Sequence, residues 1–130
     1  MTATQLPDRQ PTLRVVAMPG DVNILGSVFG GWIMAQVDIA ASIPAIRKAQ
    51  GRVATRAVNS FEFREPLFVG DVVSFYADVV KIGNTSITVD VEVYAERLRA
   101  GAYQSIKVTQ AQLTFVAVDE RGQPRPVPAK

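Results

Sequence analysis

The sequence predicts an α+β domain in which one long helix packs against an antiparallel sheet. A long apolar stretch begins at Gly30 and stops near Gly51, which suits a helix. After Gly51 the chain changes to β-branched and aromatic segments joined by short connections. Short connections favour antiparallel pairing, because parallel strands need a long crossover. The length of 130 residues is typical of one domain with its own core.

The N-terminal half contains a strand and the helix. The first segment is polar and carries two prolines, so we expect a flexible arm, and Pro19-Gly20-Asp21 breaks the chain after the first strand. Pro44 lies inside the helical stretch and predicts a kink or a local break. The expected order is an arm over 1–11, a strand over 12–18, a loop over 19–29 and a helix from 30 to about 51.

The C-terminal half reads as four strands. One of them alternates clearly, with Ile87, Val89, Val91 and Val93 on one face and polar residues between them. Gly83-Asn84 and Gly101 mark turns, and a tail with three prolines should be irregular. The expected strands are 53–63, 72–82, 85–94 and 102–118, so that the domain spans 12–118 and the tail 119–130.

The apolar helix decides the architecture. Because the helix is apolar nearly all round, it must be covered on most sides. A single strongly curved five-stranded sheet wrapped around one helix meets that demand, and this arrangement is the hotdog fold.

The composition excludes several classes of site. The chain has no Cys and no His, which excludes disulfides, thiolate nucleophiles, Ser-His-Asp triads and nearly all catalytic zinc sites. Any acid–base chemistry must therefore come from Asp, Glu, Lys or Tyr. The net charge is only +2 and the basic residues are scattered, so we expect no nucleic-acid partner. The run 31–46 is too short and too polar for a membrane span.

Asp38 is the conspicuous residue of the helix. It lies in a run of Gly, Ala and large hydrophobic residues, where an unpaired buried carboxylate costs several kcal/mol. Its carboxylate must therefore either reach solvent or take part in catalysis. If it is buried, desolvation raises its pKa, and activity should then fall as the pH drops through that value.

A motif around this aspartate resembles a known family. Asn23, Gly26, the run Phe29-Gly30-Gly31-Trp32, Met34 and then Asp38 are similar to the YciA and brain acyl-CoA hydrolase type of hotdog acyl-CoA thioesterase. Weaker matches follow along residues 12–128, among them Gly51-Arg52-Val53, Val69-Gly70-Asp71, Thr85-Ser86 and Gly122 with Pro124-Arg125.

The resemblance implies hydrolysis of acyl-CoA to a free acid and CoA, without a cofactor or metal. It implies Asp38 as the catalytic carboxylate, Asn23 as a polar partner in the site, and hotdog dimers that assemble further, often to hexamers. One departure concerns CoA binding. Similar sequences carry a basic residue directly before the proline, where this chain has Glu65 and places Arg64 one residue earlier, on the opposite face of a strand.

The chemistry of thioester hydrolysis assigns roles to the motif. Asp38 can activate water or attack the carbonyl itself. The first amides of the helix, at Gly30 and Gly31, can stabilise the oxyanion, although Gly-Gly also suits a plain turn. Ser42 lies one turn after Asp38 and can orient the water or simply bond a helix carbonyl. Asn23 can contact the thioester or form an Asx-turn.

The spacing of these groups predicts a shared site. Gly30 and Asp38 are eight residues apart, which is about 12 Å along a helix. One chain cannot place both groups at one carbonyl carbon, whereas two antiparallel helices related by a two-fold axis can. We therefore expect a homodimer with two shared sites, and the resemblance implies its further assembly to a trimer of dimers.

Candidate contacts to CoA are less specific. Backbone amides and hydroxyls of Gly83, Asn84, Thr85 and Ser86 can contact the pantetheine or a phosphate, or can form an ordinary hairpin. Basic side chains could meet the phosphates or be solvated, and aromatic ones could line an acyl tunnel or fill the core. The basic candidates are Arg64, Lys81, Arg97 and Arg99, and the aromatic ones Trp32, Phe61, Phe63 and Phe68.

Two other functions remain to be separated from hydrolysis. A hotdog dehydratase is disfavoured, because such enzymes rely on a His. A non-catalytic acyl-CoA-binding or assembly module would bind CoA tightly without turnover. The N-terminus shows no signal-peptide pattern, so we expect a cytoplasmic protein.

Overall fold

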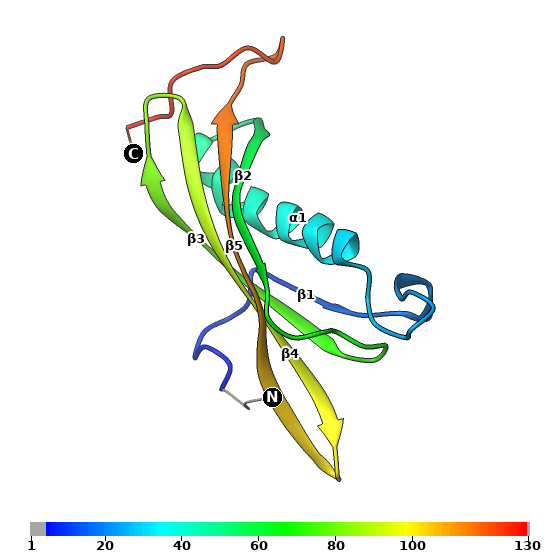
Figure 1. Cartoon of the computed structure of the whole chain (residues 1–130). Helices are drawn as coiled ribbons and strands as arrows, with labels where there is room; N and C mark the ends of the chain where they lie inside the picture. The colour runs from blue at the N-terminus through cyan, green and yellow to red at the C-terminus, as the bar shows by residue number, and fades with distance from the viewer. Residues whose placement is uncertain (1–4, 130) are drawn as a thin grey trace.

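The computed structural model describes residues 5–129 and contains one long helix beside a curved sheet (Figure 1). All strand pairs are antiparallel, and the sheet order is β1-β3-β4-β5-β2. This is the predicted hotdog arrangement. The elements are β1 (Leu13–Val16), a 3-10 turn (Pro19–Asp21), α1 (Gly30–Ala49), β2 (Val53–Phe63), β3 (Val72–Ile82), β4 (Ser86–Arg99) and β5 (Ala102–Ala117).

The helix α1 is continuous, and the predicted break at Pro44 is wrong. Ala40, Ala41 and Ala45 flank Pro44 and are fully buried against the sheet. These small side chains let the backbone approach the strands closely, and the packing holds the helix although Pro44 cannot donate a hydrogen bond. Gln50, in the left-handed conformation, ends the helix.

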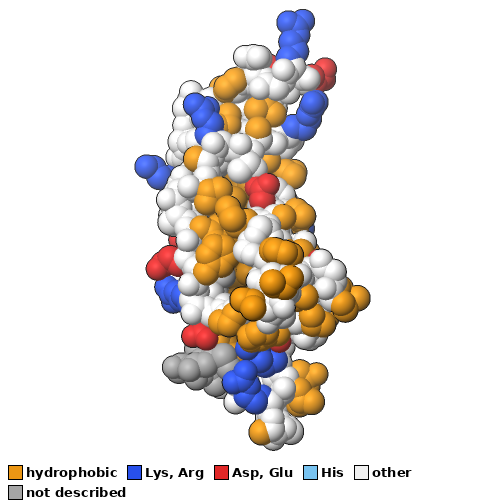
Figure 2. All heavy atoms as spheres, turned by 45° about the vertical axis from the view of Figure 1, so that its right-hand side comes forward, with side chains coloured by type: hydrophobic (Ala, Val, Ile, Leu, Met, Phe, Trp, Pro, Cys, Tyr) orange, Lys and Arg blue, Asp and Glu red, His pale blue; other side chains and the backbone are white. Residues whose placement is uncertain are grey.

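One face of α1 is not covered by residues 5–129. Ile39 and Ile46, two turns apart on one side of the helix, keep 50% and 45% of their surface exposed, and Met34, near the start of the helix, keeps 42%. The sequence-based expectation that the sheet covers most sides of the helix is therefore wrong for a single chain, because five strands reach across only one side of α1. The edge strand β2 also exposes large apolar side chains, Val58 and Phe63, and Figure 2 shows hydrophobic side chains gathered in one broad region of the surface.

The long hairpin of β4 and β5 extends the predicted strand. The alternating residues Ile87, Val89, Val91 and Val93 are fully buried, as expected. However, β4 continues beyond residue 94 to Arg99. Ala100 and Gly101 both have positive φ, at 53° and 79°, which is the geometry of a tight hairpin turn. This turn keeps the two strands paired beyond the neighbouring strands.

Both ends of the described chain contact the domain. Arg9, in the predicted arm, donates to both carboxylate oxygens of Asp78 at 2.8 and 2.7 Å. In the tail, Arg125 donates to the carbonyl oxygen of Ala49 at 3.0 Å, so the tail lies against the end of α1. Residues 1–4 of the arm and Lys130 lie outside the described residues.

Candidate active site

The N-terminus of α1 presents open amide groups. Phe29 caps the helix with its backbone, and its carbonyl oxygen accepts from Trp32 at 3.1 Å and from Ile33 at 3.4 Å. Within residues 5–129 the amides of Gly30 and Gly31 donate to no other group. Two donors and the positive end of the helix dipole are therefore available to an oxygen that gains negative charge.

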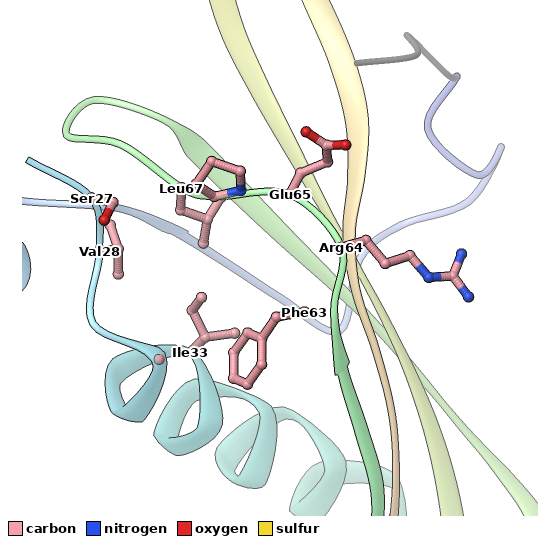
Figure 3. A pocket seen from close by; sticks show the side chains of 9 residues that line it. Ser27, Val28, Ile33, Phe63, Arg64, Glu65 and Leu67 are labelled. Atoms are coloured by element: carbon pink, nitrogen blue, oxygen red, sulfur yellow. The ribbon is translucent and has the colours of Figure 1, made fainter.

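A pocket of about 360 Å³ lies at Gly30, the first residue of the helix. Its inner lining is apolar, and Figure 3 shows Phe63, Ile33 and Leu67 converging on it. The side chain of Arg64 points away from Phe63 and Ile33 (Figure 3), and it lies 3.5 Å from a carboxylate oxygen of Glu62. The pocket is lined by Ser27, Val28, Gly30, Ile33, Phe63, Arg64, Glu65, Pro66 and Leu67.

Asp38 is held by a residue from another element. The hydroxyl group of Thr55, on β2, donates to Oδ1 of Asp38 at 2.6 Å. The pairing of β2 with β5 shifts register between Thr55 and Ala57, so Arg56 is an extra residue in the strand. Such a bulge re-aims neighbouring side chains. Asp38 is half-buried, and its Oδ2 accepts no hydrogen bond within residues 5–129.

Thr55 was not identified from the sequence. It is 17 residues from Asp38 and belongs to a strand in which Thr is an ordinary residue. No local pattern links the two positions, because their contact depends on how the edge strand lies beside the helix.

Asn23 has its hydrogen-bonding groups engaged in the loop before α1. Its Oδ1 accepts from the amides of Leu25 at 2.8 Å and Ser27 at 3.3 Å, and its Nδ2 donates to Oγ of Ser27 at 3.1 Å. This is the Asx-turn alternative, and it shapes the loop that brings Ser27 to the pocket. Ser42 donates to the carbonyl oxygen of Ile39 at 2.6 Å, which is a helix-backbone bond rather than a contact to Asp38.

The turn between β3 and β4 lies near the C-terminal end of α1 (Figure 1), whereas the pocket lies at Gly30, at the N-terminal end of the helix. Gly83 donates to the carbonyl oxygen of Ser86 at 2.9 Å, as in an ordinary hairpin. The carbonyl oxygens of Asn84 and Thr85 accept from Val127 and Ala117, which ties the tail and β5 to this turn.

Arg97 is a structural cation, so the prediction that it meets phosphate or solvent is wrong. It forms an ion pair with Asp71 at 2.8 Å, and both side chains are buried, with 7% and 4% of their surface exposed. It also donates to the carbonyl oxygen of Pro66 at 3.1 Å. The row of inward-facing residues on β4 continues to Arg97 beyond the apolar core, where the β2–β3 loop supplies its partners. This pair fixes the loop that forms one wall of the pocket.

Two kinds of site are not found in the part of the chain that the structure describes. No group of three or more acidic residues there is placed to hold a metal ion. No helix among residues 5–129 has the length and apolar character needed to cross a membrane.

Comparison with known proteins gives a consistent result. The sequence model of the Thioesterase superfamily matches residues 25–102. The acyl-CoA thioester hydrolase YciA of Salmonella typhimurium is 43% identical, over 99% of this chain and 98% of the relative.

Solved structures agree with the sequence comparison. The hexameric hotdog fold thioesterase Cj0915 of Campylobacter jejuni is 44% identical with a TM-score of 0.89, over 92% of this chain and 91% of that one. An acyl-CoA hydrolase of Staphylococcus aureus, solved with butyryl coenzyme A, is 31% identical with a TM-score of 0.80, over 89% and 70%. This chain therefore belongs to the thioesterase superfamily.

Proposed function

We propose that this protein hydrolyses acyl-CoA thioesters to a free acid and CoA. The observation that carries the proposal is the α1 helix. Its first turn has two open amides, with Gly30 at a pocket whose inner lining is apolar, and two turns later it carries a carboxylate held by Thr55. An oxyanion stabiliser, an apolar acyl site and a base or nucleophile are the three parts that thioester hydrolysis requires. The family and the substrates in the names of its relatives support the same reaction.

The groups divide the reaction between them. The thioester oxygen lies at the amides of Gly30 and Gly31, which stabilise its charge as the carbonyl carbon becomes tetrahedral. Asp38 either takes a proton from the attacking water or attacks the carbon to form an anhydride that water then cleaves. The C–S bond breaks in both routes, and the CoA thiolate leaves. Thr55 keeps Asp38 oriented through its hydrogen bond, and no cofactor takes part.

The site is shared between two copies of the chain. Two turns of helix separate Gly30 from Asp38, or about 12 Å, and neither Asp38 nor Thr55 lines the pocket at Gly30. The outer edge of β2 is free to pair. Antiparallel pairing of two β2 strands about Val58 would place Val53 opposite the partner's Phe63. Thr55 and Asp38 of one copy would then lie at the pocket of the other.

The uncovered apolar face supports this dimer. Met34, Ile39 and Ile46 on α1 and Val58 and Phe63 on β2 are all at least 42% exposed in the single chain. An exposed edge strand beside such a face is a liability unless a second copy covers it. Three such dimers would form the hexamer that the name of Cj0915 describes for that protein. An acyl-CoA substrate supports a cytoplasmic location for the enzyme.

The remaining candidates take supporting roles in this proposal. Asn23 shapes the loop at the pocket and contacts the thioester once substrate is bound, and Ser42 lies beside the attacking group. The turn Gly83, Asn84, Thr85 and Ser86 reaches the CoA of the partner's site, since antiparallel helices bring the C-terminal end of one near the N-terminal end of the other. Arg64, at the rim of the pocket, meets a CoA phosphate.

Release of CoA from a series of acyl-CoA substrates tests the function. The wild-type protein should turn over, and Asp38→Asn should lose activity by at least a hundredfold while still binding CoA. Asp119→Asn, a change of the same kind in the tail, should remain active. A wild-type protein that binds acyl-CoA without releasing CoA would instead be the non-catalytic binding module.

Mixed dimers test the shared site. Asp38→Asn damages one part of the site and Gly30→Val the other, so a mixed dimer keeps one intact site and should recover activity that neither variant has alone. If well-exchanged mixed dimers stay inactive, each chain carries its own complete site.

A further inference from the structure

The ring of Phe63 closes the passage between α1 and β2 at the pocket. A methyl group placed on Gly30 would lie 3.3 Å from Cζ and 3.6 Å from Cε1 of this ring, so the ring touches the first residue of the helix. Phe63 also lines the pocket, and 50% of the residue is exposed. Figure 3 shows the ring reaching from β2 towards the first turns of α1. Phe63 is therefore a wall of the pocket rather than part of the core.

A second aromatic ring lies behind this wall. The centroids of Phe61 and Phe63 are 4.8 Å apart, with the rings inclined by 40°. The two residues are two positions apart on one strand and so lie on the same face. Phe61 packs against the core and does not line the pocket. If Phe63 were smaller, the pocket would extend along the space between helix and strand as far as Phe61.

The direction of a bound acyl chain follows from the lining. With the thioester oxygen at the amides of Gly30 and Gly31, the chain meets Val28, Ile33 and Leu67, all buried and apolar. The charged groups of the lining are no alternative, since the side chains of Arg64 and Glu65 both point away from Phe63 and Ile33 (Figure 3). The chain therefore runs towards Phe63.

We propose that Phe63 determines the acyl-chain length that the enzyme accepts, an inference that rests on the proposed thioester hydrolysis. Phe63 limits the depth of the pocket, and chains that would pass it gain no further contact. Phe61 is the second limit and acts only when Phe63 has been reduced.

Activity over a series of saturated acyl-CoA substrates, from butanoyl to dodecanoyl, tests this proposal. In Phe63→Ala the preferred chain should lengthen. Each further methylene that is buried raises kcat/KM about fourfold, so two of them raise the ratio for the longer over the shorter substrate about fifteenfold. Phe63→Leu should shift the preference in the same direction by less and retains an apolar side chain if alanine impairs folding. Phe63→Trp should favour shorter chains.

Phe61 supplies the matched control. Phe61→Ala alone should leave the chain-length profile as in the wild type, because Phe63 still closes the passage. In the Phe63→Ala background the same change should lengthen the preferred chain again, so the two substitutions are not additive. An unchanged profile in Phe63→Ala and Phe63→Leu, with butanoyl-CoA still hydrolysed, would overturn the role of Phe63. Failure of the wild type on every acyl-CoA would instead contradict the proposed function.

Discussion

Replacing Asp71 by alanine leaves the guanidinium group of Arg97 buried without its counter-ion. In the wild type Oδ2 of Asp71 accepts from Arg97 at 2.8 Å and from the amide of Phe68 at 2.9 Å. Both charged side chains are more than 90% buried. The substitution therefore removes the negative charge of the pair and an acceptor for a backbone amide in one step.

The expected loss of stability is large for a single loop residue, because the ion pair is buried. Removing one partner of a buried ion pair costs about 3 to 5 kcal/mol, because the remaining charge is uncompensated. For a domain of this size such a loss lowers the Tm by on the order of 10 to 25 °C. The ion pair between Arg9 and Asp78 provides the comparison, since its side chains are 43% and 53% exposed. Asp78→Ala should cost at most about 1 kcal/mol.

Thermal and urea unfolding at one fixed protein concentration measure both variants, since assembly makes stability depend on concentration. The double variant Asp71→Ala/Arg97→Met should recover much of the loss, because no buried charge remains. It should stay about 1 to 3 kcal/mol below the wild type, because the amide of Phe68 is still unpaired. A loss in Asp71→Ala no larger than in Asp78→Ala, or no recovery in the double variant, would refute this reasoning.

Three further predictions concern the site and the outer face of the sheet. Thr55→Val should lower kcat/KM about 10- to 100-fold by releasing Asp38, as expected for one hydrogen bond to a charged group, whereas Thr55→Ser should keep most activity. Gly30→Ala should reduce kcat, because the new methyl group would lie 3.3 Å from Cζ of the Phe63 ring and displace the amide; an unchanged kcat would contradict this displacement and show that the ring moves aside instead. Burial, with Glu92 adding to it, raises the pKa of Tyr94. The folded state therefore holds the Tyr94 proton more tightly than the unfolded state, so its contribution to stability is complete below about pH 10. That contribution should be lost as the pH rises above about 10, so the free energy of unfolding of Tyr94→Phe should fall less steeply with pH in that range than that of the wild type.

Local patterns predicted most of the fold. The alternation of Ile87, Val89, Val91 and Val93 required a strand with one buried face, and these residues are fully buried. The bounds of β2 and β3 agree with the predicted segments. The prediction of a break at Pro44 was wrong, because local helix propensity does not include the packing of α1 on the sheet. The predicted end of β4 at residue 94 was wrong, because residues 96–99 lose apolar alternation while their pairing with β5 persists.

The candidate site was predictable only in part. Gly30 and Asp38 stand out in the sequence because glycines at a helix start and a carboxylate in an apolar run are unusual locally. The contact of Thr55 with Asp38 and the burial of Arg97 are not local. Each joins elements whose distance depends on the packing of the whole sheet, and Thr and Arg are ordinary residues in exposed strands.

Residue types and spacing thus establish the helix, the strand order along the chain, the absence of His and Cys chemistry, and the separation of Gly30 from Asp38. These properties depend on neighbours in the sequence or on composition, so they can be inferred before the packing is known. The packing of the sheet decides three other features: the hydrogen bond between Thr55 and Asp38, the position of Phe63 as a wall of the pocket, and the uncovered face of α1. They require side chains from distant segments to meet, and the distances between such segments exist only once the chain has folded.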